Sequence, residues 1–122
     1  MDFSKKTEQI IKKDPRYKPD AYEFIMQALW FTQETLKRKG HVTGRELVEG
    51  IRGFGISQYG PMTKAVLEHW GVKTTGDFGE IVFNMIEEGM LGKTDEDSRE
   101  DFKNLYDFNE AFDVKDNFKL EK

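Results

Sequence analysis

Histidine and serine are the residues of this chain best suited to proton transfer or nucleophilic attack. The sequence has two histidines and three serines, and no serine (Ser4, Ser57, Ser98) stands near a histidine in the chain. His69 falls on the predicted apolar stripe of a short helix beside Glu68 and Trp70, whereas His41 falls in a predicted turn. We therefore interpret His69 as a buried side chain hydrogen-bonded within the fold, with a catalytic or ligand role as the alternative, and expect His41 to be solvated.

The acidic stretch 94–101 has the residue type that binds calcium. A helix–loop–helix calcium site needs a glycine at the sixth position of its loop and a bidentate acid at the twelfth. Counted from Asp95, the fifth, sixth and twelfth positions are Arg99, Glu100 and Tyr106, so the pattern fails. The stretch predicts a solvated charged loop, and the sequence predicts no catalytic residue, metal ligand or cofactor.

Three closely spaced glycines, Gly50, Gly53 and Gly55, have the composition of a phosphate-binding loop. Their order is the reverse of the dinucleotide fingerprint, and they follow a predicted helix instead of a strand. The Gly50–Gly53 spacing also matches the loop by which KH domains clamp RNA. Because Ile51 continues the apolar stripe of the preceding helix, we favour a buried helix end over either kind of loop.

Composition limits the chemistry further. The chain has 122 residues, enough for one domain, and no cysteine, which excludes disulfides and thiolate metal sites. Aromatic residues make up 13% of the chain, so we expect a core built largely from rings. Residues 41–112 carry a net charge of −7, which argues against nucleic acid as a partner. No apolar run is long enough for a signal or a membrane span, so we expect a cytoplasmic protein without membrane contact.

Proline and glycine divide the chain into segments. Residues 3–13 carry a short apolar stripe, which predicts a helix that is stable only if it docks on the rest of the chain. Two prolines within residues 14–19 then predict a turn. We therefore divide the chain into an N-terminal arm and linker (1–19), a helical domain (20–112) and a flexible polar tail (113–122).

The segment 21–39 is the widest apolar pattern in the chain and predicts a helix at the centre of the fold. Asp20 and Glu23 resemble a capping box at its start, and Gly40 is suited to end it. Three further helices are predicted over 44–54, 61–70 and 75–88. Two more capping boxes support them: Thr43 with Glu46, and Thr74 with Asp77.

Residues 90–110 admit two interpretations. Residues 90–94 and 105–109 predict the strands of a hairpin joined by the acidic stretch, which we favour. The alternative is a last short helix, capped by Ser98 and Asp101, that carries Phe102, Leu105 and Tyr106. The fold class is therefore mainly α, a compact domain of about four helices around a central apolar helix, with the C-terminal β-hairpin giving it a winged-helix-like plan.

Five separated motifs occur in one order: DPRY at 14–17, YGP at 59–61, VLEHWG at 66–71, DFGEIVF at 77–83 and DSREDF at 97–102. Over residues 10–112 the chain resembles a family of small uncharacterised bacterial proteins associated with planctomycete and verrucomicrobial genomes. The resemblance implies a bacterial cytosolic protein of unknown function. It assigns no catalytic, metal-binding or ligand-binding residue.

Six residues near the C-terminus suggest a binding surface, which we term the acidic–aromatic edge: Glu87, Glu88, Phe102, Tyr106, Phe108 and Phe112. The two glutamates oppose the dipole at a predicted helix end, which a basic partner would explain. The four rings either close over the core as its lid or dock another protein or a second copy. We favour a non-enzymatic protein-interaction module, with a winged-helix-like nucleic-acid-binding domain as the first alternative and an enzyme or small-ligand binder as the second.

Overall fold

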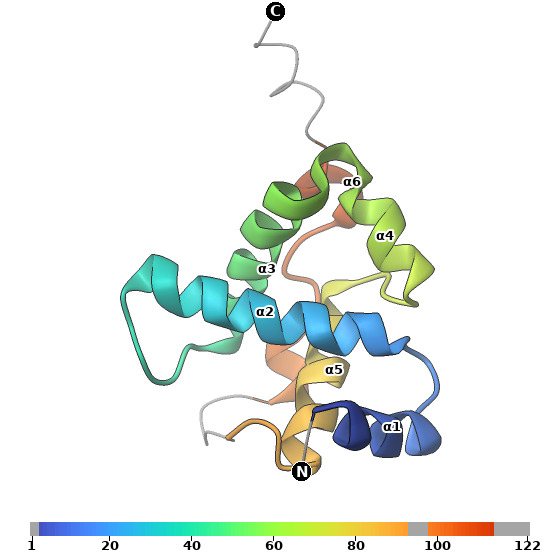
Figure 1. The fold of residues 1–122 in the computed structure, drawn as a ribbon. Coiled ribbons are helices and arrows are strands. Elements are labelled where there is room, and N and C mark those ends of the chain that lie inside the picture. The colour runs from blue at the N-terminus through green and yellow to red at the C-terminus, as the bar shows by residue number, and fades with distance from the viewer. Residues whose placement is uncertain (1–2, 93–97, 114–122) are drawn as a thin grey trace, which may run out of the picture.

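The computed structural model describes residues 3–92 and 98–113, and these are mainly helical. In chain order the elements are α1 (Phe3–Lys13), α2 (Pro19–Leu36), α3 (Gly44–Tyr59), the 3-10 helix η1 (Gly60–Met62), α4 (Thr63–His69), α5 (Thr75–Glu87), the 3-10 helix η2 (Arg99–Phe102) and α6 (Phe108–Ala111) (Figure 1).

Helix α2 crosses the middle of the molecule and packs against α1, α3 and α5 (Figure 1). It begins at Pro19, two residues before the predicted start at residue 21, because proline suits the first position of a helix. The Asp20–Glu23 capping box is therefore wrong. The helix ends where Lys37 adopts a left-handed conformation with φ of 53°, so Gly40 is not needed to end it.

Helix α3 runs to Tyr59, five residues beyond its predicted end at residue 54. Two of the three glycines that predicted a weak helix end, Gly50 and Gly55, lie instead where neighbouring chain segments come too close for a side chain. A Cβ on Gly55 would lie 2.8 Å from Cγ2 of Thr63, and one on Gly50 would lie 2.8 Å from Cβ of Thr32. These glycines therefore permit helix packing and form no phosphate-binding loop.

The predicted hairpin is wrong over its described residues. Residues 90–92 and 105–109 form no strand, and none forms elsewhere in 3–92 or 98–113; residues 93–97 lie outside the described residues. Ser98 and Asp101 instead make both bonds of a capping box and start the four-residue helix η2. The alternative short helix is thus correct at its start, but it ends at Phe102 and leaves Leu105 and Tyr106 outside it. The winged-helix-like plan is therefore not supported, because the described residues form no β-hairpin.

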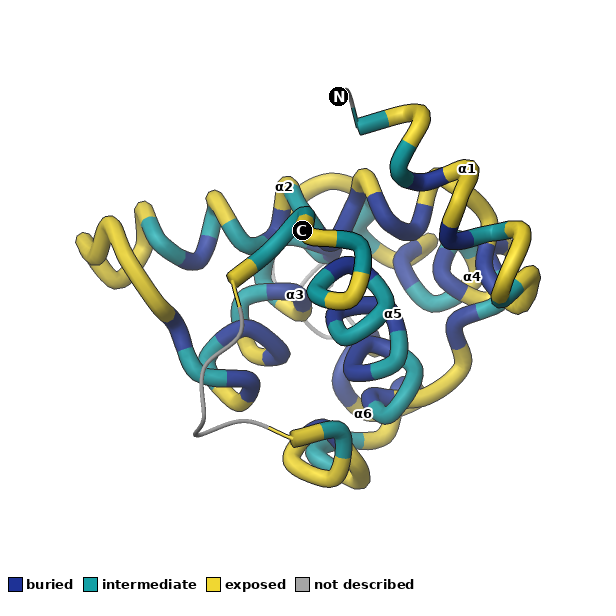
Figure 2. Tube along the Cα trace, turned by 90° about the horizontal axis from the view of Figure 1, so that it is seen from below, coloured by how far each residue is buried: buried dark blue, intermediate teal, exposed yellow. Residues whose placement is uncertain are grey.

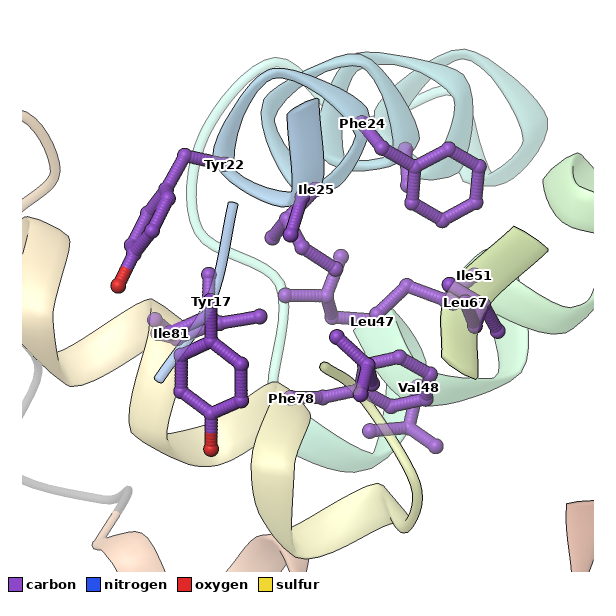
Figure 3. Packing of buried hydrophobic residues seen from close by; sticks show 14 of the residues in the cluster. Tyr17, Tyr22, Phe24, Ile25, Leu47, Val48, Ile51, Leu67, Phe78 and Ile81 are labelled. Carbon is purple, nitrogen blue, oxygen red and sulfur yellow. The ribbon is translucent and has the colours of Figure 1, made fainter. Parts of the chain in front are cut away.

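The core lies between α2, α3, α4 and α5, where rings and branched side chains meet (Figure 3). Its fully buried members include Tyr22, Ile25, Ile51, Leu67 and Phe78. The predicted helix 3–13 forms and docks on α2 and α5, burying Thr7 and Ile10. Burial follows the inward faces of the helices, whereas residues 34–41, beyond the middle of α2, are exposed throughout (Figure 2).

Candidate functional site

The two glutamates of the acidic–aromatic edge have cationic partners within the chain. Glu87 lies 3.1 Å from Nη2 of Arg99, and Glu88 lies 3.3 Å from Nζ of Lys13. Helix α5 ends at Glu87, so both carboxylates stand at the negative end of the helix dipole. Intramolecular ion pairs therefore account for them without a basic partner.

The aromatic members of the edge are largely inside the fold. Phe102, Phe108 and Phe112 are buried, and Tyr106 is half-buried with its hydroxyl donating to the Val48 carbonyl at 2.9 Å. The rings of Tyr106, Phe108 and Phe112 contact one another with centroid separations of 5.1–6.3 Å. Phe102 packs elsewhere, edge-on to Phe83. This arrangement favours the lid interpretation, and the predicted binding role of the edge stays a prediction.

His69 is exposed, so its predicted burial is wrong. The inward stripe of this region is Thr63, Leu67 and Trp70, because η1 shifts the start of α4 to Thr63. The Thr63 hydroxyl lies within hydrogen-bond distance of the carbonyls of Gly55 (2.9 Å) and Gly60 (2.7 Å), so its one proton has an acceptor inside the fold. His41 is exposed, as expected.

A polar cluster joins the 14–17 turn to α5. Asp14 accepts two bonds from the Arg16 side chain at 2.7 and 2.8 Å and one from the Asn84 amide at 3.0 Å. Tyr17 donates to Asp77, whose other oxygen accepts the backbone N–H of Lys73 at 2.8 Å. These bonds dock the turn on α5.

The electrostatics of that cluster do not suit acid–base catalysis at neutral pH. The hydrogen bonds from Arg16 hold the pKa of Asp14 far below its usual range. Burial, reinforced by the bond to Asp77, raises the pKa of Tyr17 far above its usual value. Both groups are moved away from neutrality, which is the opposite of what a general acid or base requires. The cluster is therefore better explained as a structural anchor.

The clearest candidate site is an open cleft of about 410 Å³ between α2, the α2–α3 loop and the C-terminal half of α5, which we term the apolar cleft. Most of its lining side chains are apolar. It is lined by Leu29, Gln33, Gly40, His41, Val42, Thr43, Gly44, Leu47, Val82, Phe83, Ile86, Met90, Leu91, Gly92 and Phe102. A cleft of this size and lining is typical of a binding site.

Phe102 is a tightly packed residue in the lining of the apolar cleft. A Cβ on Gly44 would lie 2.8 Å from its ring, and one on Gly79 would lie 2.7 Å from its Cβ, so two glycines make room for this side chain. The ring also meets Phe83 at a centroid separation of 6.2 Å. The guanidinium of Arg99 lies 5.2 Å from the Phe83 ring and so ties η2 to α5. The walls of the cleft are therefore held by packing on both sides.

Exposed apolar surface extends from the apolar cleft along α2. In the described chain, the large hydrophobic side chains with high exposure are Trp30 (59%), Leu36 (40%) and Met62 (58%). Trp30 and Leu36 stand three residues to either side of Gln33, a cleft residue, so the three share one region of the helix surface. Met62 belongs to η1 and does not line the cleft.

The sequence patterns missed this site. Leu29, Gln33 and Leu36 follow the helical spacing of one stripe, but the apolar pattern of 21–39 predicted only a helix at the centre of the fold. The signal in the sequence was the width of the apolar arc on 21–39. This arc is wider than the part of the α2 surface that α1, α3 and α5 cover.

Comparison with known proteins identifies no relative, since no family model, curated protein or solved structure matches the chain. The resemblance to uncharacterised bacterial proteins therefore stays a prediction. None of the helices in residues 3–92 and 98–113 is both long and apolar enough to cross a lipid bilayer. The same residues contain no group of three or more acidic or histidine side chains placed to hold a metal ion.

Proposed function

We propose that this chain is a protein-interaction module whose apolar cleft receives an apolar segment of a partner protein. The observation that carries the proposal is the apolar cleft itself, with the exposed Trp30 and Leu36 beside it on α2. Apolar surface that is gathered in one region, and that residues 3–92 and 98–113 do not cover, is typical of a protein-binding site. The proposal keeps the predicted function and moves its surface from the acidic–aromatic edge to the cleft.

The other candidate surfaces already have their partners within the chain, which supports this assignment. Within the acidic–aromatic edge, the rings of Tyr106, Phe108 and Phe112 pack on one another. Its two glutamates pair with Arg99 and Lys13. The polar cluster around Asp14 is satisfied by bonds within the chain. In contrast, Leu91 and Met90 line the apolar cleft while still partly exposed. Covering such side chains with a partner would remove apolar area from water and so favour association.

Site-specific photo-crosslinking in source cells tests the proposal. A photoreactive phenylalanine analogue replaces Leu91 in one variant and Met62 in the other. Both original side chains are apolar, but only Leu91 lines the apolar cleft. We expect a discrete crosslinked partner from position 91 that is absent from position 62. The same crosslinks from both positions, or none from position 91, would contradict the proposal.

A second variant separates loss of binding from loss of folding. Leu91 lies outside the helices and is partly exposed, so Leu91→Glu can turn its charge toward water. We expect this variant to unfold within a few degrees of the wild-type Tm and to lose the crosslink formed at another cleft position, Met90. Met62→Glu is the matched control, and it should keep that crosslink.

A further inference from the structure

A cationic stretch of the chain adjoins the apolar cleft. The nine residues 37–45 contain Lys37, Arg38, Lys39 and Arg45 and no acid, in a chain whose net charge is −4. Within this stretch, residues 40–44 line the cleft, so Lys39 and Arg45 are the chain neighbours of lining residues. The cationic stretch begins directly after α2, runs through the exposed loop that follows it and ends in the first turn of α3 (Figure 2).

Most of that positive charge is uncompensated within the described chain. Arg38 is bound by Glu46 at 2.6 Å. Lys37, Lys39 and Arg45 are exposed and have no ion-pair partner among residues 3–92 and 98–113. Glu87 and Glu88, which follow the lining residue Ile86 in the chain, are already paired with Arg99 and Lys13. Among the described residues, the exposed cations of 37–45 therefore leave an excess of positive charge beside the cleft.

Building on the function proposed above, we propose that the partner segment is an amphipathic helix whose apolar face enters the cleft and whose acidic flank lies along residues 37–45. The described residues offer no strand edge that a partner could extend, which leaves insertion of apolar side chains into a groove. The cations of residues 37–45 favour an acidic flank on the partner helix, because unlike charges across an interface promote encounter and like charges oppose it.

Two synthetic peptides of about 18 residues, or five helical turns, test this proposal by titration calorimetry. Both carry the same leucine face at helical spacing. One has glutamates along the flank, and the other has lysines in their place. We expect the glutamate peptide to bind at least about tenfold more tightly, and the difference to shrink as salt rises from about 0.05 to about 0.5 M.

Variants of the protein identify the residues responsible. Lys39→Glu combined with Arg45→Glu should reverse the preference toward the lysine peptide. Residue 45 lies in the first turn of α3, where an acid is favoured by the helix dipole, so the exchange does not weaken the helix. Lys73→Glu is the matched control, because Lys73 is equally exposed but lies on the loop before α5. It should leave the preference unchanged.

The outcomes separate this inference from the proposed function. Equal affinity for the two peptides, abolished by Leu91→Glu, would overturn the acidic flank and leave the cleft as a binding site. Absence of binding by both peptides would overturn the helix and the cleft together. A concentration-dependent dimer in sedimentation, which Leu91→Glu dissociates and neither peptide displaces, would assign the cleft to a second copy and overturn the acidic partner.

Discussion

Gly50 of α3 lies directly against the side chain of Thr32 on α2. The Thr32 hydroxyl donates to the Ala28 carbonyl at 2.7 Å, which fixes the rotamer, and its Cβ lies 2.8 Å from where a Cβ of residue 50 would stand. The two longest helices therefore cross at a point where one of them has no side chain. Their separation depends on that absence.

Gly50→Ala should destabilise the protein by about 1–3 kcal/mol, because the added methyl group overlaps the fixed threonine side chain. Gly53→Ala, three residues further along α3, is the control: its Cβ would lie 3.5 Å from the Phe31 ring, an ordinary contact. That substitution should stabilise by about 0.5–1 kcal/mol through helix propensity. Urea unfolding followed by circular dichroism measures both. Stabilisation by both alanines would contradict the close packing at Gly50.

Asp14→Asn should lower stability at neutral pH by about 1–2 kcal/mol, because the carboxylate receives charged hydrogen bonds from Arg16. The folded-state pKa of Asp14 is depressed below its ordinary value of 3.8. Its stabilisation is therefore full above that pH and is lost as the pH falls below it. Unfolding curves at several pH values should converge for variant and wild type in acid. Glu23→Gln, which alters an exposed side chain of α2, should show no such convergence.

Phe102→Ala should cost about 3–5 kcal/mol, because the ring is 99% buried in a slot formed by Gly44 and Gly79. Phe102→Leu keeps part of the volume and should cost less. Thermal and urea unfolding measure both variants. A Phe102→Ala protein of wild-type stability would contradict the close packing of this ring between the two glycines.

Tyrosine ionisation should be delayed in the folded protein. Burial raises the pKa of Tyr17, Tyr22 and Tyr106 above the ordinary value of 10.0, and the bond to Asp77 adds to the effect at Tyr17. Stability from these tyrosines is present below that value and is lost at higher pH as they ionise. Ultraviolet absorbance should show most phenolate appearing only with alkaline unfolding. A gradual rise near pH 10 without unfolding would contradict their burial.

Local sequence signals predicted the helices well where the signal was itself local. The capping boxes at Thr43 and Thr74 form as predicted, since each needs only residues three positions apart. The capping box at Asp20 failed because Pro19 competes for the same helix start. The end of α3 was misplaced because the reason for Gly50 and Gly55 lies on other elements, at Thr32 and Thr63.

The binding surface was harder to predict than the fold. Aromatic residues near Phe108 and Phe112 have the composition of an interface and of a core edge alike, and only their packing on Phe78 and one another tells the two apart. The apolar cleft depends on where the 40–44 loop meets the end of α5. No periodicity within either segment encodes that meeting.

The bonds that dock the N-terminal turn have a consequence for synthesis on the ribosome. Asp77, the partner of Tyr17, is synthesised 60 residues after it. Asn84, the partner of Asp14, is synthesised 70 residues after it. At about 5–20 residues per second, the first interval lasts roughly 3–12 s. During it, α1 can pack on α2 but not on α5, and the Tyr17 hydroxyl lacks its partner. Nascent chains arrested before residue 77 should therefore be cleaved within the first 20 residues by a protease that spares the finished protein.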